Sequence, residues 1–451
     1  MTFPAIVSQK KLMSAGPFLP MKLETTAWVK RVAMTGLGIG GTVEGEYLIF
    51  RAETILKEVI ESLGVLRSIR DLDVRGKRVL VRVDYNVPLK DGKVVDDTRI
   101  RESLETIGYL LEMDAIVILL SHLGRPKGVD DALRLDPVAK HLAKLVKRPV
   151  IKLDDCVGED VEGRLNACHH GDIVMLENLR FYPEEELNDE NFARSLAELG
   201  DVYVNDAFGV SHRAHASVDA ITRFLPSGAG FLLEREVEQL EKAVHPEKPF
   251  VAVLGGAKVS DKIGAITALA KRADAVLIGG AMMFTFLAAS GHEVGNSLVE
   301  QDRIPLAKSL LKAYGRKIVL PVDVVIKSQD GKVSTVPVTQ IPKSTHGLDI
   351  GPKTVTLFTE KCEPAATVFW NGPLGFVEDE RFVKGTAGLA KALSRMKSVR
   401  IVGGGDTVAV ISKLKLASKF SHISTGGGAS LEFIEGKRLP GIAALERKDL
   451  V

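Results

Sequence analysis

The chain has 451 residues, which is enough for two or three domains with sizeable buried cores. Its 60 Lys and Arg residues nearly balance its 58 Asp and Glu residues; the resulting net charge of +2 excludes a nucleic-acid binder that relies on bulk charge. Hydrophobic residues make up 45% and charged residues 26%, so a disordered or polyacidic chain is excluded as well. Any anion site must therefore be a local cluster of side chains.

The cysteines and the apolar runs indicate the compartment of the protein and whether it enters a membrane. Cys156, Cys168 and Cys362 are scattered and form no C-x-x-C pair, which argues against a disulfide framework and a structural zinc site. The longest apolar run, Ala275–Gly291, is interrupted by glycines and is shorter than the roughly 18 residues that span a bilayer. No signal-peptide pattern opens the chain. We therefore expect a soluble, cytoplasmic protein with no membrane or nucleic-acid partner.

Residues 1–66 differ from the remainder because they show no alternation of strand and helix patterns. The segment Gly36–Gly41 reads GLGIGG and matches the dinucleotide fingerprint G-x-G-x-x-G. No apolar-periodic helix follows it, so a plain glycine-rich turn is the alternative. The pattern of Ile55–Leu66 predicts one amphipathic helix. We interpret residues 1–66 as an N-terminal extension of unknown role.

From Ser68 onward, short β-branched runs alternate with helical segments. Near-continuous apolar runs of this length are typical of parallel strands that helices cover on both faces. The fold class is therefore α/β, with Rossmann-like lobes. The predicted strands are Arg78–Val83, Ala115–Leu120, Asp172–Leu176, Val202–Val204, Phe250–Leu254, Ala275–Ile278, Lys317–Leu320, Thr367–Trp370 and Arg400–Val402.

One long charged helix separates the strands into two groups. It lies within Gly230–Phe250, where Leu233, Val237 and Leu240 recur at three- and four-residue spacing. We interpret it as an interdomain helix, and an ordinary packing helix is the alternative. The expected lobes are residues 67–235 and 236–435.

Cationic side chains follow three of the predicted strands in the first lobe. They are His122, Arg125, Arg180 and Arg213. The carboxyl ends of parallel strands meet at one edge of a sheet, where guanidinium groups make bidentate bonds to phosphate or carboxylate. The pattern indicates a site for an anionic ligand. The alternative is structural ion pairs with Glu177, Asp206 or Asp219.

A further arginine lies at the start of a predicted helix in the segment DDTRIRESL. This residue is Arg99, and Asp97 and Thr98 before it are candidates for the helix cap. Polar Asp84 and Asn86 follow the first strand and belong to the same edge.

The strand ends of the second lobe are instead rich in glycine. They are Gly255–Lys258, Gly279–Gly280, Asn371–Pro373, Gly403–Thr407 and Gly426–Gly428. Glycine lets backbone N–H groups approach a ligand, and a strand, a glycine turn and a helix start together form an anion cradle. This edge suits a nucleotide.

The segment GGGDTVAVISKL combines such a cradle with a carboxylate. Gly404, Gly405 and Thr407 can offer N–H groups at a helix N-terminus, beside the side chain of Asp406. A carboxylate among phosphates is unfavourable unless a cation lies between them, so Asp406 is a candidate Mg²⁺ ligand. A plain helix N-cap is the alternative.

Two lysines, Lys258 and Lys262, are four residues apart and would share one face if their segment is helical. No P-loop pattern G-x-x-x-x-G-K-[ST] accompanies them, and the motifs of protein kinases are missing from the sequence.

Together these segments resemble the phosphoglycerate kinase family. The family's motifs occur in order as VRVDYNVP, SHLGRP, LENLRF, NDAFGVSHRAHAS, VLGGAKVSDKI, GLDIGP, VFWNGPLGF, VGGGDTV, STGGGASLE and LPGIAAL, between Ser68 and Lys448. The resemblance implies a monomeric, two-lobed enzyme that transfers the acyl phosphate of 1,3-bisphosphoglycerate to Mg-ADP, without a covalent enzyme intermediate. It implies closure of the lobes during the reaction, and a C-terminal tail, residues 436–451, that packs back on the first lobe.

The resemblance also implies roles for residues of the first lobe. Asp84 and Asn86 would bond the glycerate, and Arg99 would face its reacting end. The phosphate that is not transferred would be held by His122, Arg125, Arg180 and Arg213.

On the nucleotide side, the resemblance implies that Lys258 and Lys262 meet the phosphates and Glu378 the ribose. Gly404, Gly405 and Thr407 would cradle the phosphates, and Asp406 would hold Mg²⁺. The base and sugar would be bordered by Gly255, Gly256, Gly279, Gly280, Gly347, Leu348 and Pro373. The catalytic set would be Arg99, Lys258, Lys262, Gly404 and Gly405.

Three segments depart from the family pattern. Residues 1–66 have no counterpart, so they are either a genuine extension or the result of a start assigned upstream. Ile341–Gly351 differs before Gly347, in the region of the adenine contacts. Cys168-His169-His170 looks like a metal group but precedes a strand away from the ligand edge, so we assign it no metal. A non-catalytic scaffold is the second hypothesis, and the intact Arg99, Lys258 and Asp406 argue against it.

Overall fold

The computed structural model describes residues 66–446. The glycine-rich segment Gly36–Gly41, and all of the expected helix Ile55–Leu66 except its last residue, lie outside the described residues. The described chain divides into two compact units, a first unit of residues 66–238 with 439–446 and a second unit, Gln239–Arg438. The boundary between them falls inside α10 (Phe231–Val244), which is the helix expected to join the two lobes.

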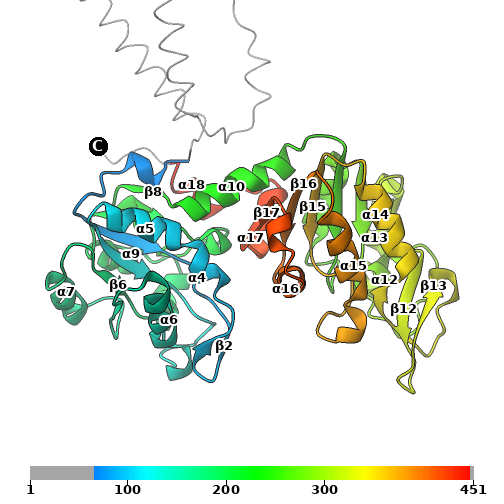
Figure 1. Ribbon diagram of the computed structural model, residues 1–451, viewed down its shortest axis with the longest axis horizontal. Coiled ribbons are helices and arrows are strands. Elements are labelled where there is room, and N and C mark those ends of the chain that lie inside the picture. Colours follow the sequence, from blue (N-terminus) through cyan, green and yellow to red (C-terminus); the bar gives the residue numbers. More distant parts are fainter. Residues whose placement is uncertain (1–65, 447–451) are drawn as a thin grey trace, which may run out of the picture. The chain divides into compact units, whose positions relative to one another are not determined.

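The first unit is built on a six-stranded parallel sheet in the order β5-β6-β4-β1-β7-β8. Figure 1 labels two of these strands, β6 and β8, among the helices of this unit. Its central strand β1 pairs with β4 on one side and with β7 on the other. The strands are β1 (Arg78–Arg82), β4 (Ile116–Leu120), β5 (Ile151–Lys152), β6 (Ile173–Met175), β7 (Val202–Asn205) and β8 (Ser227–Ala229). The sequence predicted four of them; β5 and β8 are too short to give a periodic signal.

All five residues of β4 are buried, as the continuous apolar run predicts for a strand covered on both faces. The helices that flank this sheet have ordinary sequence signals: Asp189, for example, caps α9 by accepting hydrogen bonds from the N–H groups of Asn191 and Phe192. The helices are α4 (Thr98–Glu102), α5 (Leu104–Glu112), α6 (Asp136–Val146), α7 (Glu159–Asn166), α8 (Pro183–Glu186), α9 (Glu190–Ala197) and α18 (Pro440–Ala443). A small hairpin pairs β2 (Leu89–Lys90) with β3 (Lys93–Val94).

The second unit contains another six-stranded parallel sheet, in the order β11-β10-β9-β15-β16-β17. Its strands are β9 (Phe250–Leu254), β10 (Ala275–Ile278), β11 (Ile318–Val319), β15 (Thr367–Asn371), β16 (Val399–Gly403) and β17 (His422–Ile423). Its helices are α11 (Ile263–Arg272), α12 (Met282–Ala289), α13 (Ile304–Tyr314), α14 (Pro352–Cys362), α15 (Lys384–Leu393), α16 (Gly405–Lys413) and α17 (Gly428–Ile434). Two parallel sheets flanked by helices confirm the α/β class with two Rossmann-like halves.

A three-stranded antiparallel sheet in the second unit was not foreseen. It pairs β12 (Asp323–Lys327) with β13 (Val333–Pro337) and with β14 (His346–Ile350). Most of β13 is exposed, so its sequence VSTVP lacks the apolar run by which the other strands were recognised. This sheet matters for the site because β14 carries Gly347 and Leu348.

Three other expectations concern thiols, metals and membranes. Cys156 and Cys362 are buried, Cys168 is half-buried, and all three are free thiols. Across residues 66–446, no three His, Cys, Asp or Glu side chains are grouped as metal ligands. Over the same residues, no helix is both long and apolar enough to cross a bilayer.

Candidate active site

The predicted cations of the first unit lie at one edge of its sheet. Strands β6, β4, β1 and β7 are neighbours and run parallel, so the loops that follow them start at the same edge. His122 and Arg125 follow β4, Arg180 follows β6, and Arg213 follows β7. The tertiary structure therefore gathers these residues where a ligand of a parallel sheet binds.

A second group of predicted residues is joined by hydrogen bonds at this edge. Arg99 Nη1 donates to Asp84 Oδ2 at 2.8 Å and to the carbonyl oxygen of Asn86 at 3.3 Å. The Asn86 side-chain oxygen accepts from the N–H of Gly124 at 2.9 Å. The guanidinium of Arg180 donates to the carbonyl oxygen of Gly124 at 2.8 Å. These bonds connect three of the loops and fix the distances between their polar groups.

The helix that carries Arg99 begins where the sequence predicted. Of the two cap candidates, Asp97 is the N-cap residue of α4 and Thr98 is the first helical residue. Asp97 makes no side-chain cap bond, because its carboxylate contacts Arg101 and His141 instead. The N–H and hydroxyl of Thr98 donate to Asp96, at 2.9 and 2.6 Å.

Positive charges crowd this edge of the sheet. Burial lowers the pKa of His122 well below its ordinary value, and the charges of Arg82, Arg180 and Arg99 lower it further. Burial also lowers the pKa of Arg180; Glu186 opposes this effect, whereas Arg82 and Arg213 add to it. Arg125 is exposed. A bound anion would relieve this mutual repulsion.

The carboxylates considered as alternative partners have other contacts. Glu177 is paired with Arg134 at 3.1 Å and Lys152 at 2.8 Å. Asp206 accepts hydrogen bonds from the N–H groups at the start of α10, and Asp219 is paired with Arg223. Arg180 is paired with the half-exposed side chain of Glu186, at 3.1 Å.

Sequence reasoning missed one cation, Arg82 on β1. Its side chain is completely buried, donates to Ser217 Oγ at 2.8 Å and lies 3.8 Å from the carboxylate of Glu185. Its Nη2 lies 3.3 Å from Nδ1 of His122. The signal was present in the sequence: an arginine inside the apolar run RVLVRV must find buried partners or lie at a functional edge.

The C-terminal segment belongs to the first unit. The N–H of Gly441 donates to the carbonyl oxygen of Ser211 at 2.8 Å, and Asn205 Nδ2 lies 3.4 Å from the carbonyl oxygen of Gly441. A Cβ at Gly441 would lie 2.6 Å from Val218, so only glycine permits this approach. The tail thus supports the loop that leads to Arg213.

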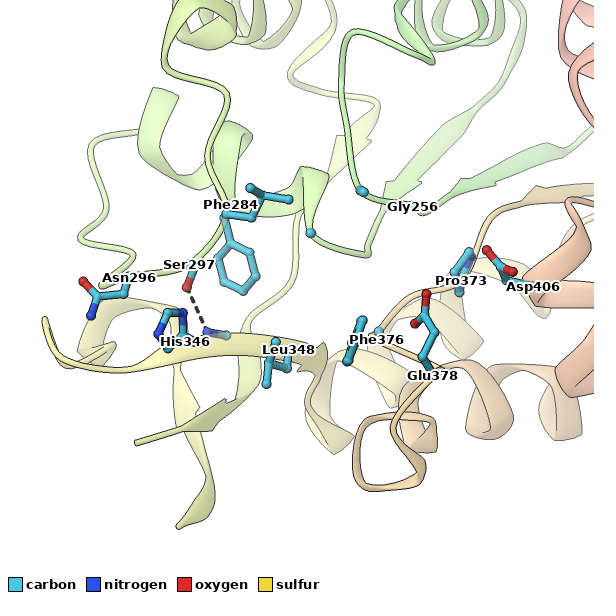
Figure 2. Close-up of a pocket in the computed structure, with 15 residues that line it drawn as sticks. Gly256, Phe284, Asn296, Ser297, His346, Leu348, Pro373, Phe376, Glu378 and Asp406 are labelled. Carbon is cyan, nitrogen blue, oxygen red and sulfur yellow. Dashed lines mark hydrogen bonds between the residues drawn. The ribbon is translucent and has the colours of Figure 1, made fainter. Parts of the chain in front are cut away.

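The second unit contains a cavity of about 540 Å³. Figure 2 shows Phe284, Leu348 and Phe376 between the polar groups of Asn296 and His346 at one end and those of Glu378 and Asp406 at the other. Six residues predicted from the sequence line the cavity: Gly256, Gly347, Leu348, Pro373, Glu378 and Asp406.

Other lining residues were not predicted, notably Phe284, Asn296, Ser297, Leu298, His346 and Phe376. The side chains of Leu298 and Phe376 are 54% and 49% exposed, which leaves apolar surface open to a flat ring. Ser297 Oγ accepts from the N–H of Gly347 at 2.9 Å and joins this wall to β14 (Figure 2). These residues come from a helix, from loops and, for His346, from the start of β14, and their sequences are indistinguishable from ordinary core or surface.

Three of the predicted glycines lie in loops directly after strands, and a Cβ on any of them would collide with another part of the protein. A Cβ at Gly255 would lie 2.0 Å from the carbonyl oxygen of Pro373, and one at Gly280 would lie 2.3 Å from the N of Gly256. At Gly279 the neighbour would be Leu374, at 2.5 Å. These glycines allow the loops after β9, β10 and β15 to pack closely behind the cavity, so their contact with a ligand stays a prediction.

The N-terminus of α16 has the form of an anion cradle. Gly404 is its N-cap with a φ of 92°, which favours glycine, and a Cβ at Gly405 would meet nothing within 4 Å. Thr407 is buried, and its hydroxyl has no hydrogen-bond partner. Because Gly404 is the cap, the alternative that Asp406 is a plain N-cap is wrong. The Asp406 side chain is exposed on the first turn.

The two lysines were expected to share one face if their segment is helical, but that condition is not met, because α11 begins only at Ile263. Lys258 is exposed in the loop before it. Lys262 turns inward, and its Nζ donates to the carbonyl oxygen of Asn371 at 3.1 Å and to the Asn371 side chain. Burial lowers the pKa of Lys262 to about 8, although Asp261 and Asp406 oppose this effect.

Comparisons with known proteins agree with one another. A family model described as phosphoglycerate kinase matches residues 69–437. The phosphoglycerate kinase of Dictyoglomus turgidum is 53% identical over 389 residues, which are 84% of this chain and 98% of that protein. The phosphoglycerate kinase structure from Pyrococcus horikoshii has a TM-score of 0.78 at 32% identity, and that from Coxiella burnetii 0.74 at 38%. Each covers 84% of this chain and 98% of its own.

With these matches, two Rossmann-like halves, one with a cationic sheet edge and the other with a glycine-framed cavity, belong to a phosphotransferase. The chain belongs to the phosphoglycerate kinase family. Enzymes of this family transfer a phosphoryl group between ATP and the carboxyl group of 3-phosphoglycerate, a step of glycolysis and gluconeogenesis.

Proposed function

We propose that this chain carries out the family's reaction with the glycerate bound to the first unit and the nucleotide bound to the second. The crowding of Arg180, Arg99 and the buried Arg82 around His122 at one sheet edge carries the proposal, because guanidinium groups held close together favour an anionic ligand. The deciding experiment measures ATP formation from 1,3-bisphosphoglycerate and ADP with Mg²⁺. Absence of turnover above background would reject the assignment.

On the glycerate side, we propose that the phosphate which is not transferred binds His122, Arg125, Arg180 and Arg213. Asp84 and Asn86 would bond the hydroxyl and neighbouring oxygens of the glycerate. Arg99, whose side chain is 33% exposed, keeps N–H groups available for the acyl phosphate end beyond those that it donates to Asp84 and Asn86.

On the nucleotide side, the apolar surfaces of Leu348 and Phe376 suit the base, and Glu378 suits the ribose hydroxyls. The first turn of α16 offers N–H groups to the phosphates, together with the free hydroxyl of Thr407. Lys258 and Lys262 add positive charge at the same end. Gly255, Gly256, Gly279, Gly280, Gly347 and Pro373 would shape the backbone around the base and sugar.

The residues present fit a magnesium ion. Asp406 places an exposed carboxylate beside the N–H groups that would bind phosphate, and Mg²⁺ usually takes one or two carboxylates plus substrate phosphates and water. When bound, the ion would neutralise charge on the phosphates. Asp406 would hold it at the helix N-terminus.

For the transfer itself, the protein needs no covalent intermediate. Arg99, Lys258, Lys262 and the N–H groups of Gly404 and Gly405 would stabilise the charge that spreads over the moving phosphoryl group. Donor and acceptor bind to different units, so we propose that the units close to align the reactants and to exclude water.

The lowered pKa of Lys262 leads to a pH prediction. In the free protein the pKa of this ammonium group lies near 8 instead of 10.5, because folding disfavours its charged form. The resulting loss of folding stability grows as pH falls from 10.5 towards 8. Nucleotide phosphates favour the charged form, so at about pH 8.5 ADP binding should take up protons and should weaken as pH rises. Calorimetry in two buffers of different ionisation enthalpy measures this uptake.

The matched control for this experiment is Lys262→Met, in which the proton uptake should largely disappear. Equal binding enthalpies in both buffers with the unmodified protein would contradict the prediction.

We also propose that the enzyme is a cytoplasmic monomer. Free thiols at Cys156, Cys168 and Cys362 are compatible with a reducing compartment.

A further inference from the structure

The loop between β9 and α11 carries Lys258 but has no regular structure of its own until α11 begins at Ile263. A carboxylate from a distant segment holds this loop. One oxygen of Glu300 accepts hydrogen bonds from the N–H groups of Val259 and of Ser260, the latter at 3.2 Å. The other oxygen accepts from the hydroxyl of Ser260 at 2.6 Å. Both oxygens of Glu300 thus bond the two residues that directly follow Lys258.

Glu300 is itself fixed in place. Its N–H donates to the hydroxyl of Thr285 at 3.2 Å, and Thr285 lies buried on α12. Burial works against ionisation of the Glu300 carboxyl group, but hydrogen bonds from Ser260 and Val259 outweigh it and hold its pKa below the ordinary value. The group is therefore a carboxylate at neutral pH and accepts all three bonds.

The segment that leads to Glu300 also forms part of the cavity wall. Asn296, Ser297 and Leu298 line the cavity, and so do Gly256 and Ala257 at the start of the Lys258 loop. Glu300 thus connects the cavity wall of Asn296, Ser297 and Leu298 to the loop that carries Lys258. The Lys258 side chain is exposed, so the backbone of its loop is what determines where its ammonium group can reach.

We propose that Glu300 is a positioning residue of the nucleotide site, which holds the loop after β9 so that Lys258 is presented to the phosphates of ADP. This inference rests on the proposed function, in which Lys258 meets those phosphates. Glu300 does not touch the nucleotide; it acts through the backbone of Val259 and Ser260. If Glu300 acted instead by repelling the phosphates, removal of its negative charge would tighten ADP binding. A positioning role predicts that the same change weakens ADP binding.

The test measures binding of Mg-ADP and of adenosine to the full chain by calorimetry. Glu300→Ala should weaken ADP binding about tenfold, which corresponds to about 1.4 kcal/mol, and should change adenosine binding less than about twofold. A role that merely maintains the fold would weaken both ligands alike, so an equal loss would overturn the proposal. Unchanged or tighter ADP binding would overturn it as well.

Two further variants keep the test informative if the alanine variant folds poorly. In Glu300→Gln the amide oxygen can accept from both N–H groups while its NH₂ group donates to Ser260, so ADP affinity should stay within about threefold of the original. Asp302→Asn is the matched control, because it removes a neighbouring charge that is exposed and paired with Arg303. A glutamine variant as weak as the alanine variant, or a control that loses ADP affinity, would count against the proposal.

A double-mutant cycle with Lys258→Ala separates this inference from the proposed function. If Glu300 acts through Lys258, the effect of Glu300→Ala should vanish in the Lys258→Ala background. Additive losses would overturn the positioning role and leave the Lys258 assignment intact. If Lys258→Ala alone leaves ADP binding unchanged, the phosphate role of Lys258 and the inference built on it both fall.

Discussion

Arg99→Ala is expected to lower kcat by about 10²- to 10³-fold, because Arg99 would act on the charge that develops during transfer. The guanidinium of Arg99 is oriented by Asp84 at 2.8 Å and by the carbonyl oxygen of Asn86, so its position does not depend on the nucleotide. ADP binding, measured by calorimetry, should therefore change little. Steady-state kinetics with both substrates give the kcat and the KM values.

The same helix offers a matched control for Arg99. Arg101 lies two residues later, is 57% exposed and pairs with Asp97, so Arg101→Ala removes an equal charge away from the proposed ligand. Its kcat should stay within about threefold of the original. Equal losses of kcat and nucleotide affinity in Arg99→Ala would count against the assignment of Arg99 to the glycerate side.

Asp406→Ala is expected to raise the Mg²⁺ concentration needed for half-maximal activity by at least about tenfold, since one charge-assisted contact to the ion is lost. The carboxylate lies on the first turn of α16 and lines the cavity proposed for the nucleotide, whereas the proposed glycerate residues belong to the first unit. Binding of 3-phosphoglycerate should therefore remain nearly unchanged. Activity is measured as a function of Mg²⁺ concentration, and calorimetry follows each ligand.

Asp302→Asn serves as the control for this charge removal as well, because Asp302 is an exposed carboxylate of the same unit and does not line the cavity. A Mg²⁺ requirement that is unaltered in Asp406→Ala, or a parallel loss of 3-phosphoglycerate binding, would refute the metal role of Asp406.

The site residues that were predicted from the sequence share one property: each is an amino acid that is uncommon at its position in a strand, loop or helix. Arginine after a buried strand, glycine before a helix and aspartate among glycines are all local anomalies, and the strand order then brings them to sheet edges. Leu298 and Phe376 have no such anomaly, because single exposed apolar residues are common on any surface, and Glu300 is one acidic residue among many. Only the structure shows which residues they contact.

Two local patterns depend on contacts that the sequence does not show. Asp97 is the N-cap residue of α4, but Arg101 one turn along attracts its carboxylate, and Asp96 bonds Thr98 instead. Lys258 and Lys262 have helical spacing, yet Glu300 bonds the backbone of Val259 and Ser260, and the helix begins only at Ile263. In both cases a side chain outside the short pattern takes up the hydrogen-bonding groups on which the pattern depends.

By itself, the sequence determined the α/β class and the division into a cationic and a glycine-rich half, which follow from periodicity and residue type along the chain. It also identified the family, through the resemblance of motifs such as VGGGDTV and SHLGRP in their family order. Only the tertiary structure decided which glycines face open space, that Lys262 points inward to Asn371 and that Glu300 holds the loop of Lys258. Such contacts join residues as far as 109 positions apart, and the packing that creates them leaves no periodic trace in the sequence.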